Sequence, residues 1–114
     1  MLIKATLEGR DDQLSEQIDR LKLEINTKRA EREKANAQTE VAQSVVARNI
    51  RLNDRKPGMV AVEDVAKGEW EMKTASAQVA IVEAEIAEVN LRVQQLDRRR
   101  TRIKQVIKLA ERGK

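Results

Sequence analysis

The second half of the chain carries a long heptad pattern of apolar residues, and this pattern constrains the fold more than any other feature. Steps of three and four residues pass through fourteen positions, of which twelve are apolar or Ala. Such spacing over many turns is typical of a helix that packs against another helix along one narrow seam. The positions are Val65, Gly68, Met72, Ala75, Val79, Val82, Ile86, Val89, Val93, Leu96, Arg100, Ile103, Ile107 and Ala110.

The first half repeats the pattern with smaller and more polar residues. Lys28 and Arg32 interrupt it, and we expect their aliphatic stems to follow the seam while their charges extend outward. Small side chains on the seam allow two helices to approach closely. The apolar, small or hydroxyl positions of this half are Leu14, Ile18, Leu21, Ile25, Ala35, Thr39, Ala42, Val46 and Leu52.

The strongest turn signal of the chain is Pro57-Gly58, at its midpoint. Proline cannot continue a helix, and glycine tolerates the backbone angles of a sharp reversal. The sequence therefore predicts an all-α fold, a long antiparallel two-helix coiled-coil hairpin that forms a single domain over residues 1–114. We expect the first helix over about 11–55, the turn at 56–61 and the second helix over about 62–111.

One antiparallel pairing brings both apolar patterns together. If the chain reverses near residues 57–60, partners on the two helices have residue numbers that add to about 117. Leu14 then faces Ile103, and Leu21 faces Leu96. Ala42 faces Ala75 in the same way, and Leu52 faces Val65. Because apolar residues meet along nearly the whole length, the two halves are expected to pack against each other.

Composition argues against catalysis. The chain contains no His, Cys, Phe or Tyr, and 37% of its residues are charged. Without His and Cys, the usual zinc sites, thiol nucleophiles and Ser-His-Asp triads are excluded. The four glycines are too scattered for a phosphate-binding loop. We expect no enzyme activity, no catalytic residue, no cofactor and no metal.

The charge pattern offers one candidate nucleic-acid surface. The chain has 23 basic and 19 acidic residues, and the densest basic run is Arg98-Arg99-Arg100-Thr101-Arg102-Ile103-Lys104. Clustered positive charge suits phosphate, but no aromatic residue is interleaved for base stacking. A solvated basic patch is the favoured interpretation, and we do not expect nucleic acid as a partner. Trp70 lies off the seam, either against its neighbours or as a contact in an interface.

The turn carries the features of a docking surface. Arg48, Arg51 and Arg55 lie within two turns of the first helix, beside Leu52 and the Met59-Val60 pair. A turn needs Pro57-Gly58 but does not need three guanidinium groups. Apolar residues ringed by charge are typical of a contact between proteins. We predict that these six residues and Ala61 bind a partner.

Three stretches resemble the α-helical hairpin of HlyD-like periplasmic adaptor proteins, the membrane fusion proteins of efflux pumps and type 1 secretion systems. They are Ala47-Arg48-Asn49-Ile50-Arg51-Leu52, Lys56-Pro57-Gly58-Met59-Val60-Ala61-Val62-Glu63-Asp64-Val65 and Ala75-Ser76-Ala77-Gln78-Val79-Ala80-Ile81-Val82-Glu83-Ala84-Glu85-Ile86. In that family the tip contacts a TolC-type outer-membrane channel through an Arg-x3-Leu-x6-Ser pattern. Arg48 and Leu52 fit its first part, and Met59 or Ala61 stands where the family has serine.

The resemblance implies a structural role in the periplasm, in a parent protein anchored to the inner membrane. Neighbouring hairpins would pack side by side as a homo-oligomer, and other domains would reach an inner-membrane transporter. No Gly-rich strand pattern precedes Leu14 or follows Ala110, so the lipoyl halves of such a parent are expected to be absent here. Two alternatives stay open: a nucleic-acid-binding arm like that of seryl-tRNA synthetase, and a cytosolic coiled-coil scaffold or chaperone arm like that of prefoldin.

Overall fold

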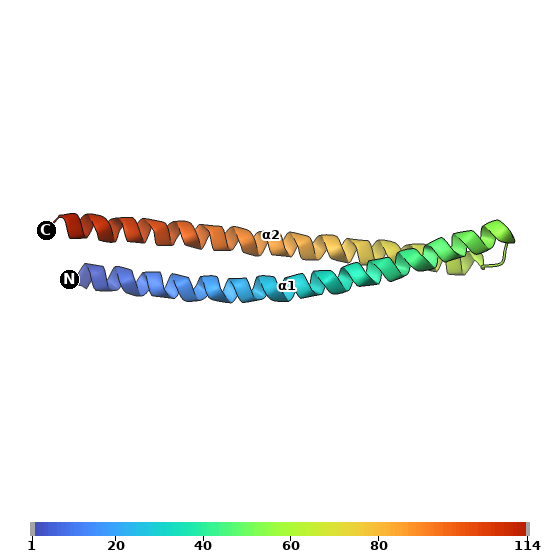
Figure 1. Cartoon of the computed structure of the whole chain (residues 1–114), viewed down its shortest axis with the longest axis horizontal. Coiled ribbons are helices and arrows are strands. Elements are labelled where there is room, and N and C mark those ends of the chain that lie inside the picture. The colour runs from blue at the N-terminus through green and yellow to red at the C-terminus, as the bar shows by residue number, and fades with distance from the viewer. Residues whose placement is uncertain (1, 114) are drawn as a thin grey trace. The chain divides into compact units, whose positions relative to one another are not determined.

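The chain forms two long helices joined by a short turn, in a computed structural model that describes residues 2–113 (Figure 1). Helix α1 spans Leu2–Arg55, and helix α2 spans Val62–Arg112. The predicted all-α hairpin is confirmed. Helix α1 starts earlier than the expected position near residue 11. Its first turns contain no proline, and Lys4 forms an ion pair with Glu111 of α2 at 2.8 Å, which supports this early start.

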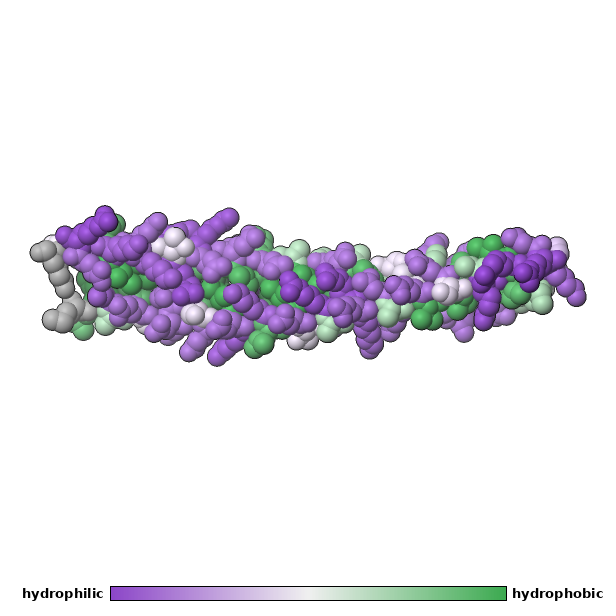
Figure 2. Space-filling model, viewed as in Figure 1, coloured by the Kyte–Doolittle hydropathy of each residue, from purple (hydrophilic) through white to green (hydrophobic). Residues whose placement is uncertain are grey.

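The seam predicted from heptad spacing is the buried surface of both helices. Every predicted position of α2 from Val65 to Ile107 is buried or half-buried, whereas Ala110 is exposed. The predicted positions of α1 follow the same rule. A coiled-coil-like hairpin therefore holds its helices together through one apolar stripe on each, and the remaining faces are hydrophilic over most of the surface seen in Figure 2.

The helices divide into two compact units, which we describe separately. The first unit joins residues 2–27 of α1 to residues 86–113 of α2, where the start of one helix runs beside the end of the other (Figure 1). Its core contains the large aliphatic side chains of Ile18, Ile25, Ile86 and Val89, all buried. This unit thus buries the larger apolar residues of the seam.

Arg100 is the one charged residue on the predicted seam of α2, and it pairs with α1. Its guanidinium Nε donates to Asp11 Oδ1 at 2.9 Å, and both side chains are largely shielded from water. The hydrogen bond from Arg100 holds the pKa of the Asp11 carboxyl below its ordinary value, against the opposing effect of burial. The charge on the seam is therefore compensated across the helix pair.

We expect the Asp11–Arg100 pair to make stability depend on acid. Because the pKa of Asp11 is lower in the folded chain than in the unfolded chain, the pair stabilises the fold above the unfolded pKa of about 4. That contribution is lost as the pH falls through the folded pKa. Urea unfolding of the wild type and Asp11→Asn should give different stabilities at neutral pH, and the difference should shrink as the pH falls below about 4. A gap that persists undiminished in acid would contradict this assignment.

The second unit runs over Lys28–Glu85 and includes the turn. Its most enclosed side chains are small, Ala35 at 2% exposure and Val82 at 1%. Lys28 does not simply extend outward as expected, because its ammonium forms an ion pair with Glu85 of α2. The hydrogen bond with Glu85 is the main cause that raises the pKa of Lys28.

No helix among the described residues is long and apolar enough to cross a membrane.

Candidate partner-binding tip

The reversal between the helices is a tight turn over Lys56-Pro57-Gly58-Met59. The backbone N–H of Met59 donates to the carbonyl oxygen of Lys56 at 3.0 Å. Gly58 has a φ of 80°, the left-handed conformation that a type II turn needs at its third position, and proline suits its second. Pro57 and Gly58 therefore form the chain reversal, as the sequence predicted.

Asn53 fastens the turn to the end of α1. Its side-chain Oδ1 accepts a hydrogen bond from the backbone N–H of Val60 at 2.8 Å. The N–H of Lys56 donates to the carbonyl of Leu52 at 3.0 Å and closes the last turn of the helix. The apolar residues after Gly58 are therefore held in place by hydrogen bonds on their α1 side.

Ala61 is the N-cap residue of α2. Its carbonyl oxygen accepts the first helical bond from the N–H of Val65 at 3.1 Å, and the helix begins at the next residue, Val62. A methyl side chain cannot accept a hydrogen bond from the free N–H groups of the first turn. Glu63 and Asp64 in that turn complement the helix dipole.

We expect Ala61→Ser to stabilise the hairpin by about 0.5–2 kcal/mol, because a serine hydroxyl at the N-cap accepts a hydrogen bond from the first turn. Thermal unfolding followed by circular dichroism measures the change. The matched control is Ala66→Ser, an exposed position inside the same helix, where serine is slightly less favourable than alanine. Equal effects of the two substitutions would show that Ala61 does not cap α2.

Residues from α1, the turn and α2 enclose a shallow groove of about 640 Å³, which we call the tip groove. It brings together five of the seven residues predicted to bind a partner: Arg48, Leu52, Met59, Val60 and Ala61. The other lining residues are Val45, Asn49, Asp64, Lys67, Gly68 and Glu71. The basic and acidic side chains of this set make the rim mixed in charge.

The two remaining predicted residues lie elsewhere. Arg51 lines a smaller hollow on α1 with Arg48 and three residues of the preceding turns. Arg55 is exposed and lines none of the described grooves. Helix geometry explains the position of Arg51. Neighbouring residues of a helix are rotated by about 100° from each other, so the side chain of Arg51 is directed well away from the side that Leu52 faces.

Asn49 and Gly68 form the floor of the tip groove, and the sequence pattern did not single them out as functional. Both are buried, and Asn49 is the one buried polar residue among the described side chains. A Cβ atom at Gly68 would lie 3.5 Å from Asn49 Nδ2, so the helices approach closely at this point. Spacing alone could have identified Asn49 from the sequence, because it continues the seam three residues after Val46.

A second groove of about 620 Å³ lies along one side of the second unit, and we call it the side groove. Trp70 and Val41, both 66% exposed, line it together with small residues such as Ala37 and Ala75. Trp70 is off the seam, as its spacing indicated. A large aromatic side chain beside small ones suits a contact with another protein.

The tip groove offers apolar contact from Leu52, Met59 and Val60 beside the guanidinium of Arg48. Met59 is 58% exposed, so its side chain is available to a partner. These groups suit binding of a protein surface through a small apolar centre and a charged rim. Comparison of the chain with protein-family models, curated proteins and solved structures found no match.

Proposed function

We propose that this hairpin is the arm of a periplasmic adaptor, whose tip docks onto a TolC-type outer-membrane channel in an efflux or secretion system. The observation that carries the proposal is the tip groove. It joins Arg48 and Leu52 of α1 to Met59, Val60 and Ala61 of the turn. These residues include the Arg-x3-Leu pair and both positions that stand in place of the family's serine.

The contact is passive and associative. Leu52 and Met59 supply apolar area at the centre, and Arg48 supplies a bidentate donor for a carboxylate or carbonyl on the channel. The turn is already ordered by the Met59–Lys56 and Val60–Asn53 hydrogen bonds. Docking therefore costs little loop entropy, and more of the contact energy appears as affinity.

The side groove completes the proposal, because an adaptor arm works beside copies of itself. Trp70 and Val41 lie away from the seam and away from the turn, on the flank of the second unit. We assign this flank to contact between neighbouring hairpins of a homo-oligomer. The inner-membrane transporter is reached through other domains of the parent protein, which is anchored in the inner membrane and works in the periplasm.

Met59→Asp tests the docking function, because the exposed side chain can be changed without disturbing the seam. We expect immobilised wild-type hairpin to bind the purified TolC-type channel of its own host, and Met59→Asp to weaken binding about tenfold or more. Leu23→Asp is the matched control. This leucine is also a large apolar residue and is 66% exposed, but it lies in the first unit.

Loss of binding in both variants, or in neither, would contradict docking through the tip groove. Leu52→Asp extends the test to the half-buried member of the site, and circular dichroism must show unchanged helicity in that variant. A wild-type hairpin that binds no such channel would remove the adaptor proposal itself. The fold would then stand without an assigned function.

A further inference from the structure

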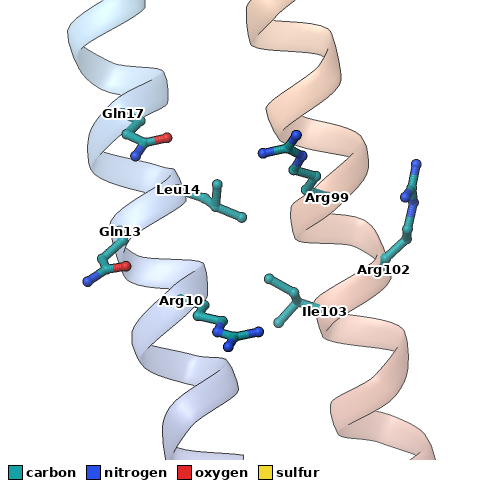
Figure 3. A pocket seen from close by; sticks show the side chains of 7 residues that line it. All are labelled: Arg10, Gln13, Leu14, Gln17, Arg99, Arg102 and Ile103. Atoms are coloured by element: carbon teal, nitrogen blue, oxygen red, sulfur yellow. The ribbon is translucent and has the colours of Figure 1, made fainter.

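The first unit contains a groove that the proposed docking function does not use. It has a volume of about 390 Å³ and lies between the two helices (Figure 3). Arg10, Gln13, Leu14 and Gln17 line it from α1, and Arg99, Arg102 and Ile103 line it from α2. We call it the arginine groove. All seven residues belong to the same compact unit.

The floor of the arginine groove is apolar. Leu14 and Ile103 point toward each other across the space between the helices, as Figure 3 shows. Both are seam residues, yet both are only half-buried. In a pair of helices each seam residue is covered by the partner helix alone, and its other sides remain accessible to water. An additional helix would remove this remaining apolar surface from water.

The apolar surface continues beyond the groove along both helices. On α2, Val106 and Leu109 follow Arg102 at helical spacing and are 47% and 66% exposed. On α1, Ile3 and Leu7 precede Arg10 at the same spacing, and Ile3 is 72% exposed. The accessible track is thus several turns long, which suits a helical partner better than a small ligand.

The arginines around the groove form no ion pair with the part of the chain that the structure describes. Within residues 2–113, Arg10, Arg99 and Arg102 have no carboxylate partner within ion-pair distance. Arg100 and Lys4 of the same unit do have such partners, Asp11 and Glu111. Figure 3 shows that Arg10 and Arg99 extend toward the space between the helices. Positive charge therefore collects at one groove.

We propose that the arginine groove binds an acidic amphipathic helix of a partner protein. The apolar stripe of that helix would cover Leu14 and Ile103, and its flanking Asp or Glu residues would pair with Arg10, Arg99 and Arg102. A guanidinium holds a carboxylate in a bidentate pair, which fixes the orientation of the incoming helix. A helix packed into the groove between two others makes a three-helix bundle.

Nucleic acid and an anionic bilayer fit these observations less well than an acidic helix does. Nucleic acid gains nothing from an apolar floor, and the lone aromatic residue of the chain, Trp70, lies in the other unit. A bilayer surface is broad and flat, whereas Leu14 and Ile103 lie recessed between two helices. Charge and shape together favour a protein helix.

Fluorescence anisotropy with a defined probe tests the proposal. The probe is a fluorescein-labelled peptide of three heptads, with Leu at the seam positions, Glu at the flanking positions and Ala elsewhere. Its twin carries Gln in place of Glu. We expect the intact hairpin to bind the acidic probe, and to bind the twin about tenfold more weakly. Binding of the acidic probe should weaken as salt is added.

Paired variants locate the binding surface. Arg99→Gln combined with Arg102→Gln should weaken the acidic probe about tenfold. Lys104→Gln combined with Lys108→Gln removes the same charge from exposed positions of α2 outside the groove, and should change binding less than about twofold. Circular dichroism of both double variants confirms that the helices are intact.

Several results would overturn the proposal. These are no binding of the acidic probe to the wild type, equal binding of its twin, and equal weakening by the two double variants. Tighter binding to a DNA duplex or to phosphatidylglycerol vesicles than to the acidic probe would assign the arginines to phosphate instead. None of these outcomes bears on docking at the tip, because Met59 and the arginine groove lie in different units.

Discussion

Truncating Ile25 to Ala is expected to destabilise the hairpin by about 2–4 kcal/mol, and Ile18→Ala by a similar amount. Ile18 and Ile25 are only 3% and 6% exposed, and they lie one heptad apart on the seam of α1. Removing three carbon atoms from either side chain forfeits apolar burial and leaves a gap that two stiff helices cannot fully close. Urea unfolding followed by the helical circular-dichroism signal measures the loss.

Leu23→Ala is the matched control for the isoleucine variants. Leu23 is on the same helix between the two buried isoleucines, but it is 66% exposed. Since it contributes little to the seam, its truncation should change the free energy of unfolding by less than about 0.5 kcal/mol. A loss at Leu23 as large as that at Ile25 would show that the seam does not hold the helices together.

Heptad spacing predicted the seam because every large apolar residue on it obeys one period. The polar members were harder to interpret. Lys28 was expected to interrupt the seam, and Arg100 was the one charged position on the seam of α2. Each forms an ion pair with the facing helix. Their partners, Asp11 and Glu85, lie on the other helix. The apolar period indicates which positions face the partner helix, but it does not indicate which acidic side chain there lies within reach of a long basic one.

The turn shows the same division between what local sequence determines and what packing adds. Pro57 and Gly58 determine the turn by their own backbone preferences, so their place could be predicted. The tip groove depends on Asn49 and Gly68, which meet only when the two helices are packed. A polar residue on a seam position interrupts the apolar pattern, and pattern analysis therefore passes over it. Buried asparagine at such a position is known to fix helix register.

The two compact units differ in the size of the side chains that they bury on the seam. Isoleucine and valine fill the first unit, whereas alanine recurs on the α1 side of the second. Leu14–Ile103 and Ala42–Ala75, paired by the expected register, each line one groove. Large residues confer stability, and small ones set how closely the helices approach. The response to added volume should therefore be strongest in the second unit.

Ala35→Leu is expected to destabilise the hairpin by about 1–3 kcal/mol, although leucine is more hydrophobic than alanine. Ala35 and Val82 are 2% and 1% exposed, so the close approach of the helices leaves no space for an isobutyl group. The larger side chain must separate the helices or adopt a strained rotamer. Either outcome reduces the contacts of Val82 and of the Lys28–Glu85 pair nearby.

Ala30→Leu on the exposed face of the same helix isolates this effect, since it adds the same volume outside the seam. Both residues favour helix, so its free energy of unfolding should change by less than about 0.5 kcal/mol. If Ala35→Leu instead raised stability above that of Ala30→Leu, the seam at Ala35 would be open enough to accept a large residue. Such a result would mean that side-chain size does not set the separation of the helices in the second unit.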